Sequence, residues 1–220
     1  MGRYKAFIFD LNGTMIDDME YHSIAWFNIL NNDLKAGLSR AEVKREMYGK
    51  NGEVLERIFG KGRFTEAEVD AISLKKETSY QDAFRPYLKL IDGLPDLLKE
   101  VDEKGIKMAI GSAAIPFNID FVLDNLGIRR YFPVIVSAND VAISKPHPET
   151  FLKAAARLNV SAGDCVVFED APKGVEAALN AGIKCVVLTT MHEKEEFLQY
   201  PNILGYIVDY RDPSLDELLF

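Results

Sequence analysis

The hydrophobic positions after residue 92 alternate between helical and strand patterns. Four segments with helical spacing each begin at a proline: Pro95, Pro116, Pro148 and Pro172. Proline in the first turn and glycine just past the last turn are typical of helices, and glycines follow three of these segments. Short apolar runs lie between them, at 106–110, 166–168 and 185–188. Helices that alternate with such strands predict an α/β fold with a doubly wound parallel sheet of the Rossmann-like type.

Residues 16–88 interrupt this alternation, because their apolar residues recur at helical spacing only. Examples are Trp26 with Leu30 and Tyr80 with Phe84. We therefore expect a helical cap at 16–88, inserted after the first strand of a Rossmann-like catalytic core formed by 1–15 and 89–220. Hinges are expected near residues 15–19 and 85–93.

The first strand ends in a group of polar residues. The apolar run at 6–9 is typical of a strand buried on both faces, and Asp10-Leu11-Asn12-Gly13-Thr14 follows it. The carboxyl edge of such a sheet is where α/β folds bind ligands. The same residues also suit a tight turn, so Asp10 alone indicates either turn formation or catalysis.

Other chemically useful residues also follow predicted strands. Glu169-Asp170 comes directly after one apolar run, and Ser112 comes after another. Lys145 lies in the loop Ser-Lys-Pro. Two adjacent acids after a buried strand need a cationic partner, and carboxylate oxygens are ligands that Mg²⁺ prefers. A carboxylate, a hydroxyl, an ammonium and a metal-binding pair together predict a site for a phosphate-like dianion.

Four elements follow one another along the chain: the loop from Asp10 to Thr14, then Ser112, Lys145 and Glu169-Asp170. In this order and at these separations they resemble the four motifs of the haloacid dehalogenase superfamily. The resemblance covers essentially all 220 residues and is nearest to the β-phosphoglucomutase-like phosphatase branch. It implies that Asp10 is a nucleophile that forms an aspartyl-phosphate, and that Lys145 contacts phosphate. It implies phosphate binding by Ser112 with the backbone amides that follow, starting at Ala113. It also implies a Mg²⁺ site formed by Asp10, the carbonyl of Asn12, Glu169 and Asp170.

One departure from the family pattern affects the expected mechanism. Most phosphatases of the family carry a second aspartate at the position of Asn12, which protonates the leaving oxygen and then activates water. An amide orients such groups but does not transfer a proton at ordinary pH. We therefore expect a phosphatase or phosphotransferase for a small phosphorylated metabolite, with general acid–base catalysis impaired at Asn12.

The predicted cap offers weaker candidates for substrate contact. His22 and Trp26 lie at helical spacing and suit packing as well as substrate binding. Lys76 resembles a cap lysine that contacts substrate in sugar-phosphate mutases. The mutases carry an arginine soon after the glycine that matches Gly49, whereas this chain has Lys50 and Asn51 there. A phosphatase is therefore favoured over a mutase. A phosphonatase-like hydrolase and a weakly catalytic phosphometabolite-binding protein remain alternatives.

Bulk properties exclude several classes of partner. The net charge is −8 and no basic cluster occurs, which argues against nucleic-acid binding. No apolar run approaches the ~18 residues that a membrane span needs. Cys165 and Cys185 lie in or beside apolar strands without C-x-x-C spacing, so we expect buried free thiols in a reducing cytoplasm. The small predicted cap suggests a monomer.

Overall fold

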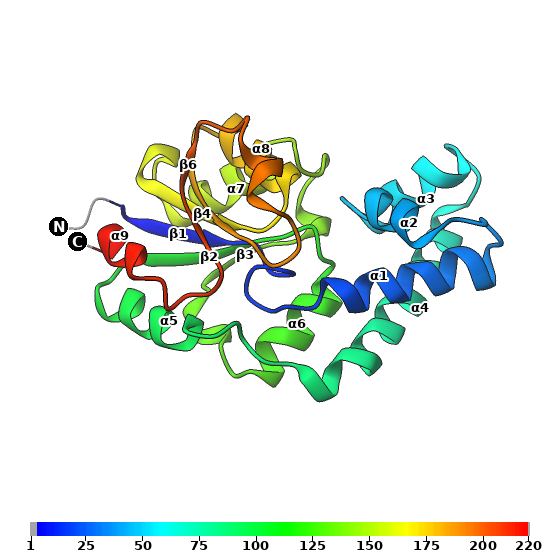
Figure 1. Cartoon of the computed structure of the whole chain (residues 1–220), viewed down its shortest axis with the longest axis horizontal. Coiled ribbons are helices and arrows are strands. Elements are labelled where there is room, and N and C mark those ends of the chain that lie inside the picture. Colours follow the sequence, from blue (N-terminus) through cyan, green and yellow to red (C-terminus); the bar gives the residue numbers. More distant parts are fainter. Residues whose placement is uncertain (1–3, 220) are drawn as a thin grey trace. The chain divides into compact units, whose positions relative to one another are not determined.

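The computed structural model of the protein describes residues 4–219, and the chain forms two compact units (Figure 1). Among these residues, the sheet unit comprises those up to Asp17 and those from Lys89 onward, and the helical unit comprises Asp18–Leu88. The first boundary thus lies two residues beyond the expected residue 15. Asp18 belongs to the helical unit because its buried carboxylate accepts a hydrogen bond from Tyr80 of that unit.

Within residues 4–219 the sheet unit contains one six-stranded parallel sheet with the order β3-β2-β1-β4-β5-β6. Its strands are β1 (Ala6–Phe9), β2 (Lys107–Gly111), β3 (Val134–Val136), β4 (Cys165–Glu169), β5 (Lys184–Leu188) and β6 (Ile203–Ile207). The predicted doubly wound parallel sheet is confirmed. The apolar runs of the sequence analysis correspond to β1, β2, β4 and β5, whereas the two edge strands were not predicted.

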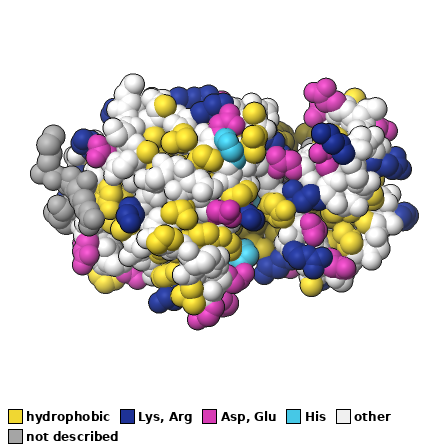
Figure 2. Space-filling view, turned by 90° about the horizontal axis from the view of Figure 1, so that it is seen from above, with side chains coloured by type: hydrophobic (Ala, Val, Ile, Leu, Met, Phe, Trp, Pro, Cys, Tyr) yellow, Lys and Arg dark blue, Asp and Glu magenta, His cyan; other side chains and the backbone are white. Residues whose placement is uncertain are grey.

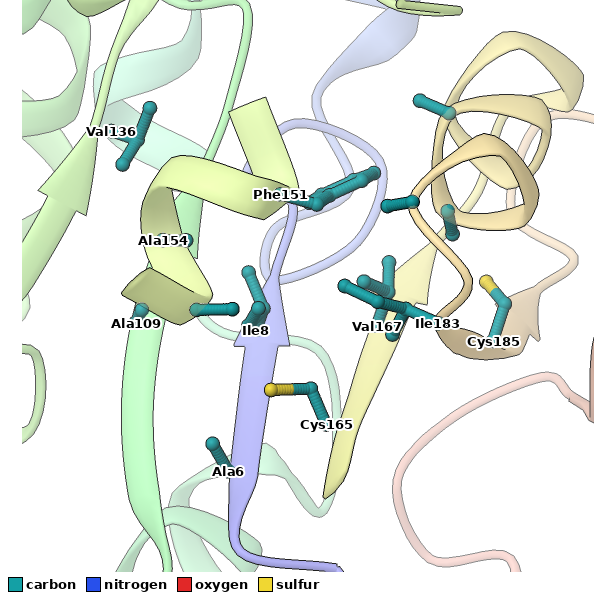
Figure 3. Packing of buried hydrophobic residues seen from close by; sticks show 14 of the residues in the cluster. Ala6, Ile8, Ala109, Val136, Phe151, Ala154, Cys165, Val167, Ile183 and Cys185 are labelled. Carbon is teal, nitrogen blue, oxygen red and sulfur yellow. The ribbon is translucent and has the colours of Figure 1, made fainter. Parts of the chain in front are cut away.

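One face of the sheet packs against α7 (Glu149–Leu158) and α8 (Pro172–Asn180). Alternate strand residues point to this face, among them Ala6 and Ile8 of β1 (Figure 3). Phe151 of α7 packs above Ile8, and Cys165 and Cys185 are buried in the same cluster. The expected burial of both free thiols is therefore confirmed.

The opposite face is aromatic at its centre. Phe9 of β1 stacks on Phe168 of β4 with ring centroids 4.7 Å apart, and Phe7 meets Phe168 edge-on at 5.3 Å. The helices α5 (Leu94–Glu103) and α6 (Pro116–Asn125) lie on this side (Figure 1). Since Phe9 and Phe168 precede Asp10 and Glu169, this packing fixes the strand ends that carry both acids. A final short helix, α9 (Asp216–Leu219), follows β6.

The helical unit contains α1 (Met19–Asn28), α2 (Arg40–Glu46), α3 (Asn51–Phe59) and α4 (Glu66–Phe84). The helices α1 and α4 pack together, and Trp26, Leu30, Val43 and Leu55 lie in the apolar core of the unit. Capping boxes begin α2 at Ser39 and α4 at Thr65. These capping residues define where α2 and α4 begin, and the helical spacing of the apolar residues supplies the face that each helix buries.

The charged side chains on the surface shown in Figure 2 are mixed in sign, as expected from a sequence without a basic cluster. On the face drawn in Figure 2, acidic and basic side chains are interspersed and neither sign covers the whole face. Among residues 4–219, no helix combines the length and apolarity needed to cross a bilayer.

Candidate active site

The carboxyl edge of the sheet brings together residues that are far apart in the sequence. Phe9 is in register with Ile110 of β2 and with Phe168 of β4. Asp10, Ser112 and Glu169 therefore emerge from three neighbouring strands at the same edge. The strands β1 and β4 are also the pair at which the strand order reverses, the position where doubly wound sheets bind ligands.

Three carboxylates meet at this point. One oxygen from each of Asp10, Glu169 and Asp170 lies within 4.8 Å of the others, and all three residues are buried. Lys145 Nζ donates to Asp10 Oδ1 at 2.6 Å and to Glu169 Oε1 at 2.8 Å. The structure thus brings together the four charged residues that the sequence analysis assigned to one site.

The electrostatics of this cluster reflect burial and crowding. Burial raises the pKa of Asp10 from 3.8 to about 7, with Glu169 adding to the rise and Lys145 opposing it. Burial, followed by the charges of Glu169 and Asp10, raises the pKa of Asp170 well above its usual value. Burial lowers the pKa of Lys145, but Asp10 and Glu169 outweigh it, so that the net shift is upward and the ammonium stays charged. Three acids and one ammonium leave a net negative charge when all are ionised.

Glu169 is held rigidly. Its Oε2 accepts hydrogen bonds from the backbone amides of Asp170 and Ala171, both at 2.8 Å, at the start of α8. A Cβ atom on Gly174 would lie 1.7 Å from Glu169 Oε1, so this helix position requires a glycine. Both oxygens of Glu169 are therefore already engaged, by Lys145 and by backbone amides.

Asp170 has a different environment. Its Oδ1 accepts a hydrogen bond from Thr14 Oγ1 at 3.2 Å, but its buried Oδ2 has no hydrogen-bond partner among residues 4–219. A Cβ atom on Gly13 would lie 2.1 Å from that Oδ2, and Gly13 has φ +73°. An unpaired buried carboxylate oxygen beside two other acids suits a divalent cation with oxygen ligands. The residues present therefore fit a Mg²⁺ ion.

The loop that carries Lys145 is fixed on both sides. Glu149 of α7 accepts hydrogen bonds from the backbone amides of Ala142 and Ile143, at 3.0 and 3.1 Å. After the lysine, the carbonyl of Pro146 accepts from Asn180 Nδ2 of α8 at 3.0 Å. These contacts fix the backbone on both sides of Lys145, and the ammonium itself is placed by its hydrogen bonds to Asp10 and Glu169.

Ser112 lies at the end of β2, next to β1. It is buried, and its hydroxyl accepts a hydrogen bond from the backbone amide of Ala114 at 3.1 Å. Ala113 between them is half-buried. This short polar turn leads into α6, as expected of a segment that offers backbone amides to an anion.

The predicted substrate residues of the cap fall into two groups within the helical unit. His22 and Lys76 belong to a buried polar cluster, with Lys76 Nζ 2.6 Å from His22 Nδ1 and 3.0 Å from Glu77 Oε2. On the other side of the ring, His22 Nε2 lies 3.3 Å from Asp18 Oδ2, which also accepts from Tyr80. Burial lowers the pKa of Lys76, and Glu77 opposes this effect.

The remaining cap candidates have structural contacts. Trp26 is 3% exposed and packs in the apolar core of the unit. Of the two roles considered for it, packing and substrate binding, this position matches packing. Gly49 has φ +78°, and the backbone amide of Lys50 donates to Glu53 at the start of α3. Asn51 Nδ2 donates to Glu77 Oε1 at 2.8 Å, which connects α3 to the polar cluster.

Two residues at the site were missed by the sequence analysis. Thr190 Oγ1 donates to the carbonyl of Gly13 at 2.6 Å, and the Tyr210 hydroxyl donates to the carbonyl of Thr14 at 3.0 Å. Thr190 follows β5 at the same sheet edge. A search for polar residues just after predicted strands, which identified Ser112, would therefore also have found Thr190. Tyr210 follows the unpredicted strand β6 and has no comparable signal.

The comparisons with known proteins agree with this geometry. A family model described as haloacid dehalogenase-like hydrolase matches residues 7–188. β-Phosphoglucomutase of Bacillus subtilis is 34% identical over 197 residues, which is 83% of this chain and 82% of that protein. Fructose-1-phosphate phosphatase YqaB of Escherichia coli is 33% identical over 193 residues, covering 84% of this chain and 96% of that protein.

Solved structures show the same fold along nearly the whole chain. A haloacid dehalogenase-superfamily hydrolase of Entamoeba histolytica superimposes with a TM-score of 0.85 at 25% identity, covering 98% of this chain and 97% of that one. β-Phosphoglucomutase of Clostridium difficile gives 0.81 at 28% identity, covering 94% and 92%. The predicted family and enzyme class are confirmed. The chain therefore belongs to the haloacid dehalogenase-like hydrolase family.

Proposed function

We propose that this protein is a Mg²⁺-dependent phosphatase for a small phosphorylated sugar, acting through an aspartyl-phosphate at Asp10. The family supplies the reaction class, and similar proteins are named fructose-1-phosphate phosphatase and validoxylamine A 7'-phosphate phosphatase. The observation that carries the proposal is the buried cluster of Asp10, Glu169 and Asp170 around Lys145.

Asp10 is suited to be the nucleophile. In the proposed reaction its carboxylate oxygen forms a bond to phosphorus while the bond from phosphorus to the substrate oxygen breaks. Water then attacks the phosphoryl group, which releases phosphate and restores the carboxylate. Lys145 keeps Asp10 oriented and stabilises its ionised form, since the ammonium donates to Asp10 Oδ1 at 2.6 Å.

The metal and phosphate contacts are proposed from the same residues. Asp10, Asp170 and the carbonyl of Asn12 would hold Mg²⁺, with Glu169 contributing directly or through water. A bound Mg²⁺ supplies charge neutralisation at the transferring phosphoryl group. Lys145 and the turn from Ser112 to Ala113 would supply further donors to the phosphate oxygens.

The helical unit favours a phosphatase over a bisphosphate mutase. The arginine nearest in sequence after Gly49 is Arg57, which donates to the backbone carbonyls of Glu46 and Tyr48 and stacks over the Tyr48 ring. Its guanidinium is thus used inside the helical unit rather than offered to a second phosphate. His22 and Lys76 stay predicted substrate-contacting residues.

The raised pKa of Asp10 should make two quantities depend on pH: the stability of the metal-free protein and the stabilisation that Mg²⁺ adds. Because the pKa of Asp10 is raised from 3.8 to about 7, the folded protein holds a proton that the unfolded chain releases. Without divalent cations, we therefore expect the melting temperature to fall as pH rises through this range. Mg²⁺ binds the ionised carboxylates. The increase in melting temperature that it causes should therefore be at least roughly twice as large at about pH 8 as at about pH 5. Differential scanning fluorimetry measures both effects.

A Mg²⁺ effect that does not grow with pH would contradict the proposed metal site. A Mg²⁺-induced increase in melting temperature that is independent of pH, or larger in acid, would mean that the ion binds elsewhere. Ca²⁺ and a monovalent salt at equal ionic strength separate specific binding from screening.

The proposed activity is tested by measuring phosphate release. The substrates are p-nitrophenyl phosphate, acetyl phosphate and a panel of hexose and pentose phosphates, each with Mg²⁺ and with EDTA. We expect turnover that requires Mg²⁺ and is fastest with the two activated compounds, because Asn12 does not protonate a poor leaving group. Absence of release from every compound would favour the alternative of a phosphometabolite-binding protein.

A further inference from the structure

The loop that follows β1 forms one wall of the proposed metal site. Thr14 Oγ1 donates to Asp170 Oδ1, and the hypothetical Cβ position of Gly13 falls 2.1 Å from Asp170 Oδ2. The backbone of residues 13 and 14 is therefore in close contact with this carboxylate. A shift of the loop would therefore change the space left beside Asp170 Oδ2.

Two hydroxyl groups from distant parts of the sheet unit fix this backbone. Thr190, just after β5, donates to the carbonyl of Gly13 at 2.6 Å. Tyr210, after β6, donates to the carbonyl of Thr14 at 3.0 Å. Consecutive carbonyl groups of the loop are thus anchored by side chains that lie 177 and 196 residues further along the chain.

Tyr210 is itself firmly placed. Its ring lies 6.4 Å from that of Phe9 and 5.8 Å from that of Phe168, the residues that precede Asp10 and Glu169. Its backbone amide donates to the carbonyl of Asp92 at 2.9 Å. A Cβ atom on Gly93, which has φ +82°, would lie 2.6 Å from the Tyr210 carbonyl carbon. Replacing Gly93 would therefore displace Tyr210.

The same residue contacts two stretches of the sheet unit that precede and follow the helical unit in the sequence. The first stretch contains Thr14 and Met15, and the second contains Ile91 and Asp92. The amide of Ile91 donates to the carbonyl of Met15 at 2.9 Å, and Tyr210 binds Thr14 on one side and Asp92 on the other. Tyr210 thus connects these two stretches to the aromatic residues that precede the acids.

We propose that Tyr210 and Thr190 are positioning residues, whose hydroxyls hold the Gly13 and Thr14 peptide groups where Asp170 keeps its oxygen available for the metal ion. This inference rests on the proposed function and assigns a role to two residues outside the family motifs discussed above. Burial and the nearby charges of Asp170 and Asp10 raise the pKa of Tyr210, so that its hydroxyl stays protonated and able to donate.

The test compares variants that remove only a hydroxyl group. Tyr210→Phe and Thr190→Val keep the ring and the branched shape, and Tyr206→Phe is the matched control. Tyr206 lies on β6, and its ring packs on Phe197 on the side of the sheet that α7 and α8 cover. Mg²⁺ binding is measured on the full chain by isothermal titration calorimetry, well below the melting temperature of each variant. Phosphate release as a function of Mg²⁺ concentration is the second readout.

A lost hydrogen bond of ordinary strength corresponds to a change of roughly threefold to tenfold in an equilibrium constant. We expect the Mg²⁺ dissociation constant to rise by about this factor in Tyr210→Phe and in Thr190→Val, and to stay unchanged in Tyr206→Phe. Because both hydroxyls hold one loop, the double variant should deviate from additivity.

The outcomes separate this inference from the proposed function. If wild-type protein binds Mg²⁺ and both hydroxyl variants bind it equally well while melting at a lower temperature, the two residues are merely structural and the inference is wrong. If wild-type protein binds no Mg²⁺, the proposed function and the inference both fail.

Discussion

Asp10→Asn should reduce phosphate release by a factor on the order of 10⁴ or more, as expected when a covalent nucleophile is removed. The substitution preserves the size of the side chain but replaces the carboxylate, to which Lys145 donates, by an amide that is a poor nucleophile. Single-turnover assays with p-nitrophenyl phosphate give the residual rate. Acid-quenched wild-type protein should carry phosphate on Asp10, detectable by mass spectrometry, and the variant should carry none.

The control for this substitution is Asp102→Asn, since Asp102 is exposed in the last turn of α5, the helix that precedes β2. It should retain wild-type activity. Asp10→Asn should stay folded and lose none of its thermal stability without metal, because burial disfavours the charge that it removes. Near-normal turnover in Asp10→Asn would mean that another group attacks phosphorus and that the covalent mechanism is wrong.

The hydrophobic pattern predicted the centre of the sheet and missed its edges for a physical reason. The strands β1, β2, β4 and β5 are largely buried, so each appears in the sequence as a short, mostly apolar run. β3 has three residues, two of them only half-buried. β6 contains Gly205 and is half-buried over most of its length. Both strands lie at an edge of the sheet and are less buried than the central strands, so the pattern of a strand buried on both faces identifies them poorly.

The convergence of the acids could be predicted because parallel strands end at one edge of the sheet. A polar residue directly after a buried run therefore lies near every other such residue, and Asp10, Glu169 and Asp170 are found together. Contacts that depend on how loops fold back lack such a rule. The hydrogen bond from Tyr210 to Thr14 and the cluster of Asp18 with His22 and Tyr80 belong to this class.

Asn12→Asp should raise turnover by about tenfold or more, because general acid–base catalysis contributes on the order of 10²–10⁴ to such reactions. The new carboxyl would protonate the departing substrate oxygen and then take a proton from the attacking water. Asn12 is half-buried in the loop after β1, two residues beyond Asp10, so the substitution adds an acid there without altering the strand. Steady-state kinetics across the substrate panel measures the gain.

The size of the gain should depend on the leaving group. A sugar alkoxide needs a proton to depart, whereas p-nitrophenolate and acetate do not, so hexose phosphates should gain most in the step that forms the phosphoenzyme. Hydrolysis of the phosphoenzyme should accelerate equally for all substrates, because the same intermediate is involved. Asn12→Ala is the matched control, since it removes the amide without adding an acid, and it should not exceed the wild-type rate. Equal rates for Asn12→Asp and wild-type protein on hexose phosphates would show that a different group already carries the proton, and that the amide at position 12 does not limit catalysis.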